Sequence, residues 1–211
     1  MQADKELLWL IVRIRKKDGC VMGNHMDLDY EMFCYQCEQT ANGKGCTRQG
    51  VCGKTPQIAG LQDLLLFQLK GISVYGKQLL DAHQAVEEPV IRFIENGLFT
   101  TLTNVNFDEK VHVELLRESQ RIKEKLREQA GEAKKPVPQT TYTLPETETD
   151  MWKDAPLAGI MYDRLLDEDI RSLRQTVLYG LKGISAYGHQ ARELGYRNAA
   201  VDAFYIEALA A

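Results

Sequence analysis

The residues IAGLQDLLLFQLKGISVYGKQLL, at positions 58–80, carry the clearest structural pattern in the chain. One set of residues recurs at intervals of three and four, which is the period of a helix with one face against a core. That face consists of Ile58, Leu61, Leu64, Leu65, Gln68, Leu69, Ile72 and Tyr75. The pattern therefore predicts a long, core-facing helix.

Part of this helix is repeated later in the chain. LKGISVYG at residues 69–76 recurs as LKGISAYG at residues 181–188. The same offset relates a second pair of dipeptides, Ile94-Glu95 and Ile206-Glu207. A whole helix–loop–helix unit is thus duplicated. We expect close helix packing in both copies, where glycine lets the backbones approach and Tyr75 and Tyr187 fill the seams.

Turn residues and helix caps divide the remaining sequence. Pro89 stands near the start of a second helix, predicted over residues 90–102. Asp108 is a suitable N-cap for a third helix, residues 109–130, whose charged side is expected to face solvent. Helical periodicity resumes over residues 169–194.

These elements predict an all-α fold of stacked helical bundles, preceded by a glycine-rich cysteine loop that holds a metal centre. The expected divisions are 1–31, an atypical N-terminal extension; 32–57, the cysteine loop; 58–131, a first helical bundle; 132–168, a linker or extended excursion; and 169–211, a second helical unit.

Each end of the sequence supports a further prediction about how the chain is organised. Residues 1–31 lack a sustained helical period, so we interpret Met32 as the natural start and Cys20 as a bystander. In the first copy of the repeat the second helix continues beyond its Ile-Glu pair, whereas the second copy stops in an apolar run at Ala211. The sequence therefore predicts a truncated second unit, a fragment of a longer protein.

Charge and hydropathy exclude two classes of partner. The chain has 26 Lys and Arg against 30 Asp and Glu, for a net charge of -4, which argues against a nucleic-acid-binding protein. Its longest early apolar run, residues 7–12, is far shorter than the roughly 20 residues that cross a bilayer. No export signal follows that run, so a cytoplasmic protein without a membrane partner is expected.

The cysteines carry the functional signal. Four of the five lie close together in the pattern Cys34-x2-Cys37-x8-Cys46-x5-Cys52, and none follows in the rest of the chain. A single tight cluster is typical of metal ligation rather than of disulfides spread over a fold. Glycines between the cysteines allow backbone amides to approach sulfur atoms. Positive charge that stabilises thiolates is supplied nearby by Lys44, Arg48 and Lys54.

Three kinds of site can use four cysteines. Structural zinc sites have two short knuckles, whereas the second pair here is separated by five residues. Disulfides are disfavoured because no export signal is present. An iron–sulfur cluster with an electron-transfer role is the favoured interpretation. A structural metal module, with zinc or a redox-silent cluster, is kept as the alternative.

Three segments together resemble a known family. They are MFCYQCEQTANGKGCTRQGVCGK at residues 32–54, LQDLLLFQLKGISVYG at residues 61–76 and LFTTLTNVNFD at residues 98–108. They resemble the N-terminal region of the hybrid cluster proteins, also called prismane proteins or hydroxylamine reductases, and more distantly the carbon monoxide dehydrogenases. The resemblance covers about residues 32 to 211.

The resemblance implies a mostly helical first domain with an iron–sulfur cubane that receives electrons from a soluble donor. The cubane passes them to a hybrid iron–sulfur–oxygen cluster in later domains, where hydroxylamine is reduced to ammonia. It implies that Cys34, Cys37, Cys46 and Cys52 are the cubane ligands. Their short spacing resembles that of members with a 4Fe–4S cluster.

One departure from the family is important. The hybrid cluster of the family uses further cysteines, and this chain has none after Cys52. We therefore expect the chain alone to be inactive and its partner to be the missing C-terminal domains or a separate chain with the hybrid cluster. An exposed apolar patch is predicted where those domains would dock.

Overall fold

The computed structural model describes residues 32–163 and 166–211. The described part is helical, and its only β-type pairing is an isolated bridge in the cysteine loop. The all-α fold class with an N-terminal cysteine-rich region is confirmed. The elements are η1 (Ala41–Gly43), α2 (Pro56–Asp81), α3 (Glu88–Thr100), α4 (Glu109–Ala130), α5 (Pro138–Thr141), α6 (Glu148–Asp154), η2 (Ala155–Leu157), η3 (Ile160–Asp163), α7 (Glu168–Glu193) and α8 (Ala199–Ala210). The predictions for residues 1–31, including Cys20, lie outside the described residues.

Side-chain caps fix where the principal helices begin. The hydroxyl of Thr55 accepts a hydrogen bond from the backbone N–H of Ile58, and Pro56 occupies the first turn of α2. The carboxylate of Asp108 accepts hydrogen bonds from the amides of Lys110 and Val111 at the start of α4. The predicted N-cap of the third helix is therefore confirmed.

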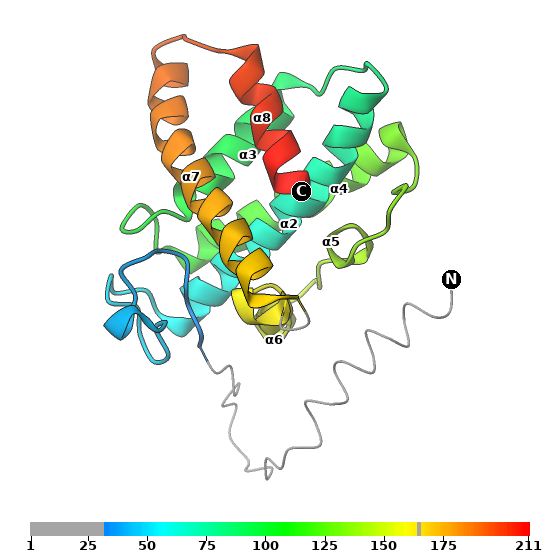
Figure 1. The fold of residues 1–211 in the computed structure, drawn as a ribbon. Coiled ribbons are helices and arrows are strands. Elements are labelled where there is room, and N and C mark those ends of the chain that lie inside the picture. The colour runs from blue at the N-terminus through cyan, green and yellow to red at the C-terminus, as the bar shows by residue number, and fades with distance from the viewer. Residues whose placement is uncertain (1–31, 164–165) are drawn as a thin grey trace.

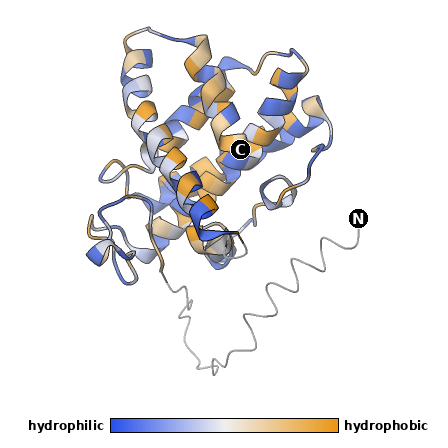
Figure 2. Ribbon diagram, viewed as in Figure 1, coloured by the Kyte–Doolittle hydropathy of each residue, from blue (hydrophilic) through white to orange (hydrophobic). Residues whose placement is uncertain are grey.

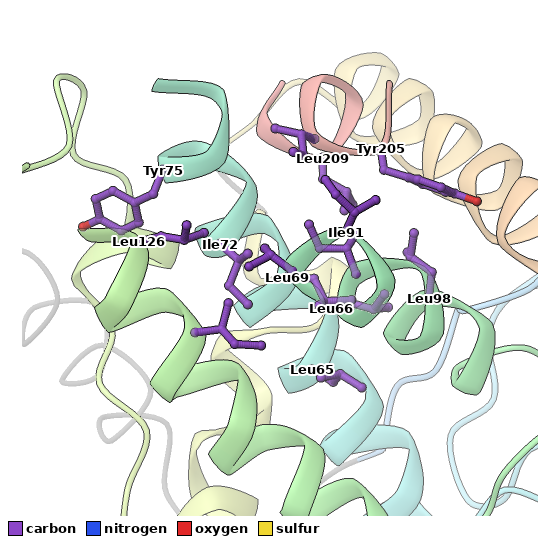
Figure 3. Close-up of a cluster of buried hydrophobic side chains, with 14 of the residues drawn as sticks. Leu65, Leu66, Leu69, Ile72, Tyr75, Ile91, Leu98, Leu126, Tyr205 and Leu209 are labelled. Atoms are coloured by element: carbon purple, nitrogen blue, oxygen red, sulfur yellow. The ribbon is translucent and has the colours of Figure 1, made fainter. Parts of the chain in front are cut away.

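Helix α2 is the centre of the molecule. It packs against α4 on one side and against α8 on another (Figure 1). Figure 3 shows Ile72 of α2 near Leu126 of α4, and Leu209 of α8 above the buried side chains. Leu61, Leu65 and Ile72 are fully buried. The apolar face that the sequence predicts for α2 therefore forms the core.

The two copies of the repeat exchange partners. Helix α2 packs more closely on α8 of the second copy than on α3 of its own copy, and α7 packs more closely on α3 than on α8. The equivalent glycines Gly76 and Gly188 both lie at these contacts. A Cβ at Gly76 would lie 3.3 Å from Ile206, and one at Gly188 would lie 2.7 Å from the carboxylate of Glu95. In both copies, therefore, a glycine stands where a neighbouring helix approaches the backbone closely.

The two repeat tyrosines differ. Tyr75 is 1% exposed and lies beside Leu126, whereas Tyr187 is 79% exposed. The prediction that tyrosine fills a helix seam is confirmed for Tyr75 and wrong for Tyr187. The physical reason is that α4 covers the corresponding side of α2, and no described element covers that side of α7.

The segment between α4 and α7 contains more structure than the predicted linker. Helices α5 and α6 are short, and both pack against α2. The ammonium group of Lys123 in α4 donates hydrogen bonds to the backbone oxygens of Gln139 and Tyr142 at 3.3 and 2.6 Å. This segment therefore closes the α2–α4 side of the core.

Hydrophobic residues recur through most of α8 and in bands along α7 (Figure 2). Even so, within residues 32–163 and 166–211 no helix combines the length and the apolar character needed to cross a bilayer.

Candidate metal centre

The four clustered cysteines lie in one loop that precedes α2. Cys34 and Cys46 form an antiparallel bridge, in which the N–H of each donates to the carbonyl of the other at 2.9 and 3.0 Å. Both side chains are buried, whereas Cys37 and Cys52 are half-buried. All four are free thiols. The loop therefore offers two sulfurs from its folded interior and two nearer its surface.

Tight turns shape the loop around the sulfur atoms. Gly45 and Gly53 have φ angles of +107° and +93°, which side-chain-bearing residues rarely adopt. A Cβ at Gly50 would lie 3.0 Å from the sulfur of Cys52, so the backbone approaches that thiol closely. The amide of Ala41 donates to Cys46 Sγ at 3.4 Å. Amide donors to sulfur and close glycine backbone are features of iron–sulfur sites.

These residues fit a cluster by the chemistry of their donor set, which is four cysteine thiols without a disulfide. Across residues 32–163 and 166–211, no three side chains of the His, Cys, Asp and Glu types are gathered as ligands of one metal ion. The thiolates of a cluster bind different iron atoms and so need not meet at a single point.

A buried polar network anchors the Cys34–Cys37 turn to α2. The Gln36 side chain donates to the backbone oxygen of Ala59 at 2.9 Å and to Asp63 Oδ1 at 2.8 Å. Its Oε1 accepts a hydrogen bond from Lys54 Nζ at 2.6 Å. Gln36, Lys54 and Asp63 are all at least 93% buried. Lys54 is thus close to the cysteines, as the sequence suggests, but it binds Gln36 rather than facing solvent.

Helix α7 holds the same turn from the other side. Tyr179 Oη and Gln175 Nε2 donate to the backbone oxygen of Tyr35 at 2.7 and 3.1 Å. Lys182 Nζ donates to the backbone oxygen of Gln36 at 3.3 Å and is 2% exposed. Side chains of the second repeat copy therefore hold the cysteine loop in place, although this loop lies about 140 positions earlier in the chain.

Burial alters the acid–base chemistry of this network. It raises the pKa of the Cys34 thiol to about 11, and the charge of Asp63 adds to the effect. It raises the pKa of Asp63 to about 6 and lowers the pKa of Lys182 to about 7. Cys34 is consequently protonated at neutral pH in the metal-free protein, and a metal that binds it must displace a proton.

The sequence located the cysteines but missed Gln36, Asp63, Tyr179 and Lys182. Gln36 stands between two cysteines of the motif, and Lys182 belongs to the repeated LKGIS segment. Both residues could therefore have been singled out from the sequence. Asp63 and Tyr179 lie within helical patterns that only tertiary contacts distinguish from ordinary helix residues.

Comparisons with known proteins found matches that cover most of this chain. A profile described as the Prismane/CO dehydrogenase family matches residues 32–211. A hydroxylamine reductase of Bacteroides fragilis is 43% identical over 180 residues, which cover 85% of this chain and 32% of that protein. A hydroxylamine reductase of Thermoanaerobacter pseudethanolicus is 40% identical over 182 residues, which cover 85% of this chain and 33% of that protein. The chain thus spans about a third of the length of these curated relatives.

Proposed function

Because this chain belongs to the Prismane/CO dehydrogenase family, we propose that residues 32–211 are the electron-transfer region of a hydroxylamine reductase. Family members carry iron–sulfur clusters. The proposed group is one 4Fe–4S cluster bound by Cys34, Cys37, Cys46 and Cys52. The observation that carries the proposal is that one loop contains four free thiols, glycines with positive φ and an amide donor to sulfur.

A bound cluster would supply one-electron transfer, and the surrounding residues would hold its loop. Lys54 and Lys182 place two buried amino groups around Gln36, between two of the proposed ligands. Positive charge in a poorly solvated site favours the reduced, more negative state of an anionic group. The Gln36 network and the α7 hydrogen bonds would fix the Cys34–Cys37 turn, so that little rearrangement accompanies electron transfer.

The remaining steps belong to the whole enzyme. We propose that electrons arrive from a soluble donor and leave for a hybrid cluster on later domains or on a separate chain. There hydroxylamine would accept two electrons and two protons, with cleavage of its N–O bond, to give ammonia and water. The present sequence has no cysteine after Cys52 for such a cluster, so we propose that it is not catalytic alone.

Anaerobic reconstitution with iron and sulfide tests the proposal. We expect about four irons and four acid-labile sulfides per chain, and a paramagnetic signal after one-electron reduction. Cys37→Ser should lower the iron content, whereas Cys20→Ser, at the remaining cysteine, should leave it unchanged. A colourless protein that binds zinc and neither iron nor sulfide would instead support a structural metal module.

A further inference from the structure

Cys34 and Cys46 face each other across the only β-type pairing of the described residues. The backbone N–H of Cys34 donates to the carbonyl of Cys46 at 2.9 Å, and the reverse hydrogen bond measures 3.0 Å. In a hydrogen-bonded antiparallel pair of this kind the Cα atoms lie about 5.5 Å apart. Disulfides join Cα atoms that are about 4.4–6.8 Å apart, most often about 5.5–6 Å. The backbone of these two cysteines therefore already has the separation that a disulfide needs.

The side chains of the two cysteines also lie together. Residues directly opposite each other in an antiparallel pair place their side chains on the same face. Both cysteines belong to one small buried cluster with Met32 and Ala59, and they are 5% and 4% exposed. Both are free thiols. The pair therefore combines close side chains with two groups that can be oxidised to one bond.

Contacts between protein groups hold the segment that joins the two cysteines. The hydroxyl of Thr40 accepts a hydrogen bond from the amide of Gly45 at 3.1 Å. The ring of Phe33 lies over Gly45, because a Cβ added at this glycine would be 2.7 Å from the ring. Phe33 immediately precedes Cys34, and Gly45 immediately precedes Cys46. The contact between these neighbours keeps the two cysteines opposite each other.

The other two cysteines of the loop are placed differently. Cys37 and Cys52 are half-buried, and neither takes part in a β-type pairing within residues 32–163 and 166–211. The turn from Cys34 to Cys37 is anchored to α7 by hydrogen bonds to two of its backbone oxygens, and a rearrangement of the turn would break those bonds. Cys46 is therefore the favoured partner of Cys34.

The same pairing predicts a bond that is easily reduced. Cβ atoms in hydrogen-bonded pairs lie near the upper end of a range of about 4.5–5.5 Å, whereas a disulfide places them about 3.8 Å apart. Bond formation therefore pulls the two backbones together, and disulfides under such strain are reduced more readily than relaxed ones. Easily reduced disulfides are typical of regulation rather than of structural support.

We propose that Cys34 and Cys46 form a reversible disulfide when the cysteine loop holds no metal, so that the pair is a redox-sensitive modification site. The oxidised loop has two free thiols in place of four, and it cannot bind the 4Fe–4S cluster through all four cysteines. This consequence rests on the proposed function, whereas the formation of the bond does not.

Hydrogen peroxide is the oxidant that suits these buried thiols, because it is small. One thiol takes an oxygen atom from hydrogen peroxide and becomes a sulfenic acid, with release of one water molecule. The second thiol displaces the hydroxyl group of the sulfenic acid, which forms the S–S bond and releases a second water molecule. Two electrons pass from the thiols to the peroxide, and the two thiol protons leave in the water. A dithiol reverses the oxidation by thiol–disulfide exchange.

Peptide mapping of the metal-free 211-residue chain after treatment with hydrogen peroxide tests the proposal. We expect the number of thiols that react in denaturant to fall from five to three. Mass spectrometry should show one cross-linked pair of peptides, which contains Cys34 and Cys46, and dithiothreitol should restore both thiols. Cys46→Ser and Cys34→Ser should each abolish this cross-link. Cys52→Ser, at a cysteine of the same loop outside the pair, is the matched control and should form it as the wild type does.

Metal binding is measured separately with cobalt(II) alone, which does not reduce disulfides and whose thiolate complexes absorb in the near-ultraviolet. The absorption of the oxidised chain should be at most half that of the reduced chain, because two of the four loop thiols are lost. Equal absorption would overturn the proposed effect on the loop.

Three other results would overturn the bond itself. They are a peroxide-treated chain that keeps all its thiols, a cross-link between Cys34 and Cys37, and a cross-link between two chains. Failure of the reduced chain to assemble a cluster from iron and sulfide would instead overturn the proposed function, and the cross-link between Cys34 and Cys46 would still be confirmed by its own measurement.

Discussion

Helices α2 and α7 share an eight-residue motif with one difference, valine at position 74 and alanine at position 186, yet their surroundings differ sharply. Helix α2 is covered by α4 and α8, so its apolar face is fully buried. Helix α7 packs on α3 with one face, binds the cysteine loop through polar side chains, and leaves an apolar stripe exposed. The α7 stripe consists of Ile170, Leu173, Val177, Ile184 and Tyr187. Apolar residues at helical spacing therefore identify a helix face that can be buried. Whether that face is buried depends on which other helices the chain places beside it.

The largest expected difference between the copies concerns a buried isoleucine and its exposed equivalent. Ile72→Ala should lower the free energy of unfolding by about 2–5 kcal/mol, because it removes buried methyl groups and leaves a cavity. Ile184→Ala should change it by less than about 1 kcal/mol, because the side chain is already partly in water. Urea denaturation followed by circular dichroism measures both values. Equal losses at the two positions would show that the α7 stripe is buried in solution.

Substitutions at the equivalent glycines Gly71 and Gly183 should change stability in opposite directions. Each change should be smaller than the loss expected for Ile72→Ala. Gly71→Ala places a Cβ against the backbone oxygen of Gln139, and such overpacking costs about 1–3 kcal/mol. Gly183→Ala meets open space within a helix and should stabilise the chain by up to about 1 kcal/mol. Thermal unfolding of the two variants measures the contrast. A loss of stability in Gly183→Ala would contradict the open environment of that residue.

Much of the fold could be predicted from residue patterns. The period of residues 58–80, the cap at Asp108 and the repeat identified long helices and their apolar faces, because these features depend on local spacing. Helices α5 and α6 could not be identified this way, since four and seven residues are too few to establish a period. The exchange of partners between the two hairpins also had no local signal. It depends on which faces meet in three dimensions.

The candidate site divides in the same way. The four cysteines are grouped by spacing within one loop, so sequence alone locates them. The groups that hold the loop come from far along the chain: Asp63 from α2, and Tyr179 and Lys182 from α7. Their role follows only from the packing of α7 beside the loop. The second repeat copy, which appears in the sequence as a simple duplication, therefore serves both the core and the site.

The smallest expected effect concerns the first repeat copy alone. There the free energy of unfolding should depend on pH, because Lys123 of α4 is buried against α2. Lys123 of α4 lies across Gly71, and its Nζ donates to Gln68 Oε1 and the backbone oxygen of Tyr142, both at 2.6 Å. Burial lowers the pKa of Lys123 from 10.5 to about 8, an effect that Glu124 opposes and Arg127 reinforces. Between these pH values the unfolded chain binds more protons at this residue than the folded chain does, so stability rises with pH.

From pH 8 to pH 9.5 this residue should add about 1–1.5 kcal/mol to the free energy of unfolding. Lys123→Met should lose that rise while keeping the contribution of every other group, including Lys182, whose pKa is also lowered by burial. Urea titrations of both proteins at the two pH values give the difference. A rise of equal size in wild type and variant would mean that Lys123 is hydrated, and hence that α4 does not pack closely over Gly71. The close contact between α4 and α2, which distinguishes the first repeat copy from the second, would then be absent.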